Sequence, residues 1–173
     1  MLTWSDTQEV IRTKELARLL RSPEQKAHYA KAKQFFLENY GGTAEFVIKE
    51  RLQWDGDAIR PRGTRFLGDL RDVKLLINDF SYDFEPGMHH FVVWSKLPIP
   101  CGPDDFPTPE ATKAIESFIR RQFTERCNID PENLQWFRNT GALQSIHSVS
   151  HFHVLVRHCD EQLKNRILDN LIT

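Results

Sequence analysis

Apolar side chains recur at helical spacing along the first part of the chain. Over residues 7–21 they fall on one side of a helix, and the Ser-Asp pair at 5–6 is placed to cap its start. A Ser-Pro pair at 22–23 then predicts the start of a second helix, which the glycines at 41–42 end. The sequence therefore predicts two amphipathic helices ahead of the first strand.

Farther along the chain, apolar and polar positions alternate in a way that favours β-strands. β-Branched and aromatic side chains are frequent in these segments, and a Pro-Gly pair at 86–87 predicts the turn of an antiparallel hairpin. Strands are expected over residues 44–54, 73–80, 89–99, 134–138 and 150–157. We therefore expect a mainly antiparallel sheet.

Two further helices complete the predicted fold. A Thr-Pro pair predicts a central helix over about 108–127, and a short C-terminal helix is expected over 160–172. With 173 residues, of which 40% are hydrophobic, the chain can build one sizeable core. The prediction is a single α+β domain over 1–173, with a helical N-terminal part at 1–42 and a sheet with helices at 43–173.

The balance of charge limits how the chain could bind a polyanion. Its 23 basic and 24 acidic residues give a net charge of -1, which excludes binding of nucleic acid by bulk charge alone. Basic residues nevertheless outnumber acidic ones in residues 1–75, and Arg60, Arg62 and Arg65 share a loop that contains Gly and Pro. These arginines are candidates to hold phosphates, although a solvated loop would have the same composition.

Cysteine usage and the length of the apolar runs bear on the compartment. Cys101, Cys127 and Cys159 are odd in number and lack the spacing of zinc ligands, so we expect no metal site and a reducing environment. No apolar run is long enough to cross a bilayer, and the first residues do not resemble a signal peptide. We expect a protein of the cytoplasm, or also of the nucleus, that has no membrane partner and no cofactor.

The densest cluster of reactive side chains lies in the segment 139–153. On a strand, His151 and His153 are two residues apart and therefore point to the same face. Imidazole titrates near neutral pH, so two such rings could exchange protons or attack an acyl or phosphoryl group. The alternative is that both rings are hydrogen-bonded structural elements of the sheet.

This segment resembles the histidine-triad superfamily, in which a Pro-Gly-His turn precedes a His-x-His-x-His strand. The corresponding residues are Asn78, Pro86, Gly87, His89, Asn139, Ser148, His151 and His153. Leu155 stands where the third histidine belongs. The resemblance implies a histidine-triad-like fold in which His153 is the nucleophile.

A more extensive resemblance covers nearly the whole chain. The segments that carry it are 78–82 (NDFSY), 90–96 (HFVVWSK), 136–139 (WFRN), 143–146 (LQSI) and 151–155 (HFHVL). They resemble a fungal family of formerly unknown function that includes the N-acetylglucosamine-induced protein of yeasts and the arginine-containing cyclodipeptide synthases. The resemblance implies a tRNA-dependent aminoacyltransferase that joins arginine and a second amino acid, taken from aminoacyl-tRNAs, into a diketopiperazine.

That activity divides the candidate residues into three groups. The expected catalytic residues are His151, His153, Glu110, Ser145 and Asn139. The expected substrate contacts are Asp104, Asp105, Asp79, Tyr82, His89, His90, Trp94 and Trp136. The expected contacts to tRNA phosphates are Arg60, Arg62 and Arg65. Carboxylates suit the guanidinium of arginine, and aromatic rings suit a terminal base.

The acidic group departs from the pattern of the synthase branch. That branch is associated with an Asp-Asp-x-x-Glu motif, whereas here four residues separate Asp105 from Glu110. The same carboxylates could instead cap a turn and stabilise a helix N-terminus.

Two other functions remain open from the sequence. One is a histidine-triad-like hydrolase or transferase of nucleotides or sugar nucleotides, which would form a phosphohistidine at His153. The other is a non-catalytic protein of N-acetylglucosamine-responsive metabolism, in which His151 and His153 affect only stability. The sequence predicts neither the second amino acid of a product nor the oligomeric state.

Overall fold

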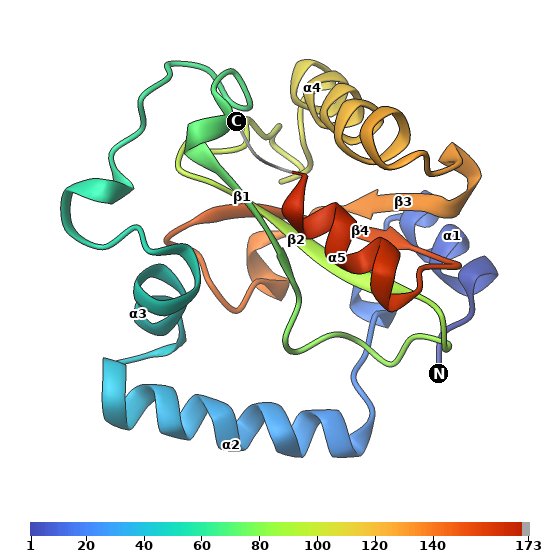
Figure 1. Cartoon of the computed structure of the whole chain (residues 1–173). Helices are drawn as coiled ribbons and strands as arrows, with labels where there is room; N and C mark the ends of the chain where they lie inside the picture. The colour runs from blue at the N-terminus through green and yellow to red at the C-terminus, as the bar shows by residue number, and fades with distance from the viewer. Residues whose placement is uncertain (171–173) are drawn as a thin grey trace.

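The computed structural model describes residues 1–170, with a four-stranded antiparallel sheet at its centre (Figure 1). The strands are β1 (Val73–Ile77), β2 (His89–Ser95), β3 (Leu134–Phe137) and β4 (Ser150–Val156). Their order in the sheet is β1-β2-β4-β3, so the two predicted strand pairs meet along β2 and β4. These central strands pair over their full lengths, from His89 opposite Val156 to Ser95 opposite Ser150. The expected α+β fold with an antiparallel sheet is confirmed.

Five α-helices surround this sheet in the described part of the chain. They are α1 (Trp4–Thr13), α2 (Pro23–Tyr40), α3 (Thr43–Phe46), α4 (Pro109–Ile119) and α5 (Glu161–Asp169). Both α3 and α4 continue directly into π-helical turns, at Val47–Leu52 and Arg120–Glu125 respectively. Figure 1 shows α2, the longest helix, at the periphery of the molecule and separate from the sheet.

The first helix starts earlier and ends sooner than the predicted 7–21. Thr3 and Asp6 cap it reciprocally, because the side chain of each accepts a hydrogen bond from the backbone N–H of the other. The helix ends where Lys14 adopts a left-handed φ of 60°. Apolar side chains beyond this break, such as Leu16, pack in the same cluster as α1, which is why helical spacing extended the prediction too far.

The ends of the other predicted helices agree more closely with the sequence. Ser22 caps α2 by accepting a hydrogen bond from the backbone of Gln25, and Gly41 ends it with a φ of 89°. The C-terminal helix α5 lies within the expected 160–172, of which residues 171–173 lie outside the described part of the chain.

The strand expected over residues 44–54 is wrong, because most of this segment is helical. Ala44, Val47 and Ile48 recur at helical spacing and pack into one cluster with Trp54. Their β-branched and aromatic neighbours raise the strand propensity, but burial of this apolar stripe decides the outcome. The correction matters for the functional site, since the helical turn after α3 carries Arg51.

The two central strands have an apolar face and a histidine face. On the apolar face, Phe91, Val93, Phe152 and Val154 are buried in a cluster with side chains of α4 and α5. Alternate residues point the other way. We define the histidine face as His90, Val92, Trp94, His151 and His153.

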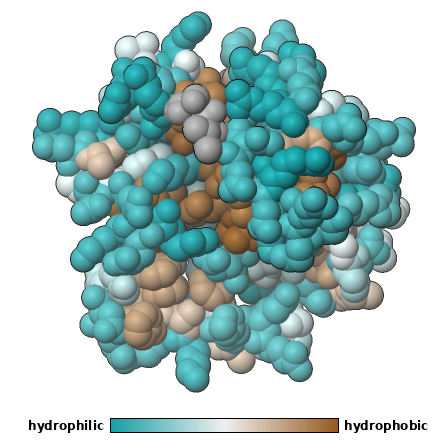
Figure 2. Space-filling model, viewed as in Figure 1, coloured by the Kyte–Doolittle hydropathy of each residue, from teal (hydrophilic) through white to brown (hydrophobic). Residues whose placement is uncertain are grey.

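The surface in the orientation of Figure 1 is mostly hydrophilic. Figure 2 shows that polar side chains cover most of this side, and that hydrophobic atoms appear mainly toward its middle. Within residues 1–170, no helix combines the length and the apolar character needed to cross a membrane.

Candidate functional site

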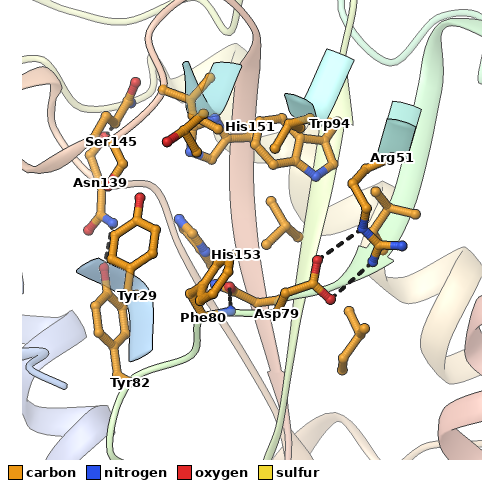
Figure 3. A pocket seen from close by; sticks show the side chains of 18 of the residues that line it. Tyr29, Arg51, Asp79, Phe80, Tyr82, Trp94, Asn139, Ser145, His151 and His153 are labelled. Atoms are coloured by element: carbon orange, nitrogen blue, oxygen red, sulfur yellow. Dashed lines mark hydrogen bonds and ion pairs between the residues drawn. The ribbon is translucent and has the colours of Figure 1, made fainter. Parts of the chain in front are cut away.

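A pocket lies on the histidine face, between the sheet, α2, α3 and the loop over residues 139–146. It offers about 110 Å³ to the centre of a water-sized molecule, which is room for several waters or part of a small ligand. The labelled side chains of Figure 3 gather around this space: Tyr29, Arg51, Asp79, Phe80, Tyr82, Trp94, Asn139, Ser145, His151 and His153. Six separate segments of the chain therefore contribute these labelled residues to one site.

His153 presents an unpaired nitrogen to the pocket. Its ring stacks on Phe137, with 4.6 Å between ring centroids, and its Nδ1 lies 2.8 Å from Nε2 of His90. The side chain is only 5% exposed, yet its Nε2 has no hydrogen-bond partner within the described residues. Because buried polar atoms rarely lack partners, this nitrogen is a candidate contact for a water molecule or for an atom of a ligand.

A hydrogen-bonded chain extends from His153 into the protein. His90 contacts His153 through Nε2, while its Nδ1 lies 2.9 Å from the hydroxyl oxygen of Ser81. A neutral imidazole carries one N–H, so the protons of this chain run in one of two directions. If His90 donates to His153, the pocket-facing Nε2 carries a proton; in the other direction, that Nε2 presents a lone pair. Ser81 and His90 therefore influence whether His153 is a donor or an acceptor in the pocket.

His151 has its tautomer fixed by the backbone. Its Nδ1 lies 2.9 Å from the carbonyl oxygen of Val149, which can only accept, so Nδ1 carries the ring proton. The ring packs against Trp94, its cross-strand partner, with 4.4 Å between centroids. The Nε2 atom of neutral His151 then keeps a lone pair, so the ring adds a second imidazole acceptor to the pocket lining.

Burial keeps these histidines neutral. Desolvation lowers the pKa of His90 to about 3 and the pKa of His151 to about 4. Desolvation also lowers the pKa of His153 well below its ordinary value, and the neighbouring imidazoles and Arg21 add to this effect. At neutral pH the rings are therefore uncharged, and a ring nitrogen that keeps its lone pair can accept a hydrogen bond or act as a nucleophile without first losing a proton.

Two arginines and one carboxylate charge the pocket wall. Arg51 binds Asp79 through two contacts, from Nε to Oδ2 at 2.9 Å and from Nη2 to Oδ1 at 3.2 Å. Among the described lining residues, Asp79 is the only acidic one. Arg21 lies over the rings of Tyr29 and Tyr82, at 4.5 and 5.1 Å from their centroids. Within residues 1–170, no group of three or more His, Cys, Asp and Glu side chains is arranged to hold a metal ion.

Asn139 contributes a second unpaired polar group. Its Nδ2 donates to the hydroxyl of Tyr82 at 2.9 Å, whereas its buried Oδ1 has no partner among the described residues. A tyrosine hydroxyl can accept or donate, so the opposite orientation of the amide would leave its nitrogen unpaired instead. The side chain of Gln144 donates to the Asn139 carbonyl at 2.7 Å and fixes the turn. In either orientation, this amide offers a ligand one hydrogen-bonding atom.

Known proteins resemble this chain in both sequence and structure. Residues 3–157 match the family described as a protein of unknown function, DUF3605. The chain belongs to the DUF3605 family. N-acetylglucosamine-induced protein 1 of Candida albicans is 27% identical over 184 residues, which cover 96% of this chain and 72% of that protein. An uncharacterized protein of Saccharomyces cerevisiae is 30% identical over 176 residues, which cover 97% and 87% respectively.

A solved structure shares the fold of this DUF3605 protein. The crystal structure of HTC1 is 29% identical in sequence and superimposes with a TM-score of 0.81, covering 99% of this chain and 96% of HTC1. Together, these matches confirm the predicted resemblance to the family that includes the N-acetylglucosamine-induced protein.

Many of the residues expected from the sequence meet at the DUF3605 pocket. Those that line it are Asp79, Tyr82, Trp94, Asn139, Ser145, His151 and His153. His151 and His153 share one face of β4, as predicted from their spacing. His90 does not line the pocket but lies directly behind His153, to which it is hydrogen-bonded. Its expected role as a substrate contact stays a prediction.

Three of the acidic residues expected at the site, namely Asp104, Asp105 and the expected catalytic Glu110, lie outside the pocket. Asp104 and Glu110 are exposed, and neither lines it. Asp105 accepts a hydrogen bond from the backbone N–H of Gly141 and forms an ion pair with Arg138 at 3.2 Å. These contacts brace the turn after β3, so the position of Asp105 supports a structural role.

The remaining expected residues are also placed away from the pocket. His89 points to the opposite face of β2, and Trp136 packs at the margin of the apolar cluster. Arg60, Arg62 and Arg65 are exposed on their loop and do not line the pocket. Their predicted contact with tRNA would have to lie outside it.

Four residues in and around the site were not predicted from the sequence. Arg51 lies in the segment 44–54, which was predicted to be a strand. That prediction gave no reason to place Arg51 near the histidines. Arg21 and Tyr29 lie in the helical N-terminal part, where no motif connects them to a sheet. Ser81 lies inside the segment NDFSY that carries the family resemblance, so a signal for it was present.

Proposed function

We propose that this protein is a tRNA-dependent cyclodipeptide synthase that uses arginyl-tRNA and a second aminoacyl-tRNA, and that the reaction takes place in the histidine pocket. The observation that carries the proposal is the Nε2 atom of His153, buried and unpaired on the pocket wall. An aminoacyl ester is already activated. The enzyme therefore needs only to hold two esters, accept a proton from an α-amine and stabilise an oxyanion.

The imidazole of His153 suits the proton transfer. When the α-amine of one aminoacyl group attacks the ester carbonyl of the other, a C–N bond forms and the attacking nitrogen becomes strongly acidic. Neutral His153 takes that proton at Nε2 and returns it to the ribose oxygen as the ester C–O bond breaks. In a second round, the free amine of the dipeptide attacks its own ester and closes the diketopiperazine. A proton acceptor in the pocket serves both rounds.

Asp79 supports the choice of arginine as one substrate. A carboxylate offers more lone pairs than the two contacts to Arg51 use, so a second guanidinium can bind beside Arg51 or displace it. The ring of Trp94 can cover the aliphatic part or the cation of the substrate. Asn139 and Ser145, on the loop beside the pocket, would orient the reacting groups.

The test is mass spectrometry of small molecules released when the protein is incubated with charged tRNAs, including arginyl-tRNA. Ribonuclease-treated tRNA is the control for tRNA dependence. We expect an arginine-containing diketopiperazine that disappears with ribonuclease. In His153→Asn its formation should fall about 100- to 10,000-fold, because Asn can keep a contact to His90 but lacks Nε2.

The exposed His147 supplies the matched control. His147→Asn makes the same chemical change on the loop beside the pocket, so product formation should stay within twofold of the original protein. No diketopiperazine with any charged amino acid, or equal loss in both variants, would overturn the proposal.

The free Nε2 of His153 also favours a second candidate, a histidine-triad-like nucleotide transferase or hydrolase. The ring is hydrogen-bonded through Nδ1 and unpaired at Nε2, which is the arrangement expected of a nucleophile. Its Nε2 would attack phosphorus and displace the leaving group, and water would then hydrolyse the phosphohistidine. This candidate predicts a phosphohistidine that can be trapped with a nucleoside phosphoramidate and is absent from His153→Asn. Turnover without a trapped adduct would remove it.

A further inference from the structure

We infer that Arg21 forms an anion-binding subsite of the pocket, which takes a phosphate or carboxylate group of the ligand. Arg21 lies two residues before the start of α2, next to its N-cap Ser22, and lines the pocket. The inference concerns what the pocket binds and rests on the proposed function only in taking the pocket as the site. It holds for either chemistry proposed above.

The plane of the Arg21 guanidinium is held in place while its outer nitrogens remain free. Its Nε donates to the carbonyl oxygen of Phe80 at 2.9 Å, and the group lies over the rings of Tyr29 and Tyr82. Within the described residues, its two terminal nitrogens have no hydrogen-bond partner. A fixed guanidinium with free terminal N–H groups can bind an oxyanion through two parallel hydrogen bonds.

Comparison with Arg51 shows why Arg21 is the cation available to a ligand. Both side chains line the pocket, but Arg51 is already paired with Asp79 through two contacts. In the part of the chain that the structure describes, no carboxylate lies within ion-pair distance of Arg21. An incoming anion would gain charge-assisted hydrogen bonds there without displacing another carboxylate.

Two unpaired buried atoms in the same pocket point independently to a ligand. They belong to Asn139, which is 4% exposed, and His153, which is 5% exposed. Tyr82 links Asn139 to the subsite, because its ring lies beneath Arg21 and its hydroxyl accepts a hydrogen bond from Asn139. A ligand that places an anion at Arg21 can therefore pair these atoms with adjacent polar groups.

These features define the ligand by its chemistry. It carries a compact oxyanion and a neighbouring hydrogen-bonding group, and its size is limited by the volume of the pocket. A phosphate could come from the terminal nucleotide of a tRNA or from a free nucleotide. A carboxylate could come from a free amino acid or another small acid. The shared chemistry is the oxyanion at Arg21.

The experiment is an NMR titration of the isotope-labelled full chain with inorganic phosphate in one arm and acetate in the other. Sodium chloride keeps the ionic strength constant. We expect saturable shifts of the Nε–H signal of Arg21 and of the side-chain amide of Asn139. The tighter-binding anion identifies the source: phosphate indicates a nucleotide or tRNA, and acetate indicates a small acid.

Arg21→Gln should weaken the preferred anion at least tenfold, since it removes the charge and both terminal donors. Arg18→Gln is the matched control, because Arg18 is an exposed arginine already paired with Glu15, and it should change affinity less than twofold. If Arg21→Gln does not fold, the anion affinity of Arg21→Lys is compared with that of Arg18→Gln instead. It keeps the charge but not the paired donors, so binding should still weaken several-fold.

Equal affinity in the Arg21 variant, no saturable shift with either anion, or shifts centred on Arg60 and Arg62 would overturn the subsite. This result is separable from the proposed function. Diketopiperazine formation without anion binding at Arg21 would remove the subsite and leave the synthase. Anion binding without product would do the reverse.

Discussion

The two faces of β4 use neighbouring residues of one strand in different ways. On the apolar face, Phe152 and Val154 are fully buried in a cluster that α4 and α5 close. On the histidine face, His151 and His153 are almost as deeply buried, but the latter keeps an unpaired nitrogen. The apolar face gains stability from burial, whereas the histidine face pays a desolvation cost for one polar atom, Nε2 of His153, that nothing in the described chain satisfies.

This difference indicates where the fold has been shaped for something other than stability. A sheet of this size could have been sealed on both sides by apolar residues, as it is around Phe152. Instead, the central strands carry neutral imidazoles that are connected to Ser81 and open to a pocket. Unsatisfied polar groups that persist in a well-packed region are expected at functional sites.

The largest expected effect comes from the apolar face. Phe152→Ala should lower the free energy of unfolding by about 3–5 kcal/mol, because it removes a fully buried ring and leaves a cavity. His153→Asn, one residue away, should lower it by only about 1 kcal/mol, since it also removes an unsatisfied buried nitrogen. Urea denaturation of both variants measures the difference. Equal losses would mean that the two faces contribute alike to stability.

The next effect is a dependence of stability on pH that arises from the histidine face. Burial lowers the pKa of His151 to about 4, so between about pH 6.5 and 4 the unfolded chain binds a proton that the folded chain does not. The stabilisation is therefore complete above pH 6.5 and is lost as the pH falls. At pH 5 the loss from this one residue should be about 2 kcal/mol.

His151→Asn tests that assignment, because Asn can still donate to the carbonyl of Val149 but does not titrate. Between pH 5 and 6 the stability of the original protein should fall by about 1.2 kcal/mol more than that of His151→Asn. The exposed His147→Asn change is the matched control and should leave the slope as it is. An unchanged slope in His151→Asn would show that the acid sensitivity arises elsewhere.

The sequence predicted the two central strands well, but it predicted poorly the segments that pack over their histidine face. Alternation along β4 fixes which of its residues share a face, so His151 and His153 could be placed together from the sequence alone. The pairing of β2 with β4 joins two distant strand pairs, and local pattern carries no information on that choice. The helical segment that holds Arg51 also has strand-like composition, and only its burial against the sheet distinguishes the two.

The function of individual polar residues was harder to predict than their position. The pattern at 104–110 resembles a recognition motif, but Asp105 is used to hold Gly141 and Arg138. Conversely, Arg21 has no motif, and its role depends on two tyrosines that approach it from separate segments. Chemistry that arises from tertiary contacts cannot be inferred from local spacing alone.

A smaller effect is expected at the inner end of the hydrogen-bonded chain. In Ser81→Ala, the amide nitrogen of Asn78, 3.4 Å from Nδ1 of His90, becomes the remaining partner of that atom and can only donate. When that amide donates to Nδ1 and not to Nε2 of His90, which is also 3.4 Å away, His90 donates through Nε2 to His153, whose own Nε2 becomes protonated. The stability cost should be about 1 kcal/mol.

Nitrogen-15 NMR of the imidazoles measures this change directly. The signal of His153 Nε2 should move toward that of a protonated nitrogen in Ser81→Ala and stay near its original value in Ser81→Thr, which keeps a hydroxyl. The exposed Ser148→Ala change is the control. Identical imidazole spectra in all of these variants would show that Ser81 has no influence on the pocket-facing nitrogen.

The smallest expected effect tests whether any chemistry lies on the apolar side of the sheet. Glu110 is exposed in the first turn of α4, the helix that closes the apolar face, and it does not line the pocket. Glu110→Gln should lower stability by no more than about 0.5 kcal/mol, through the helix dipole, and should leave diketopiperazine formation within twofold. Asp79→Asn makes the matching change in the pocket and should reduce incorporation of arginine. A large loss of product in Glu110→Gln, with Asp79→Asn unaffected, would move acidic recognition out of the histidine pocket and break the comparison between the two faces.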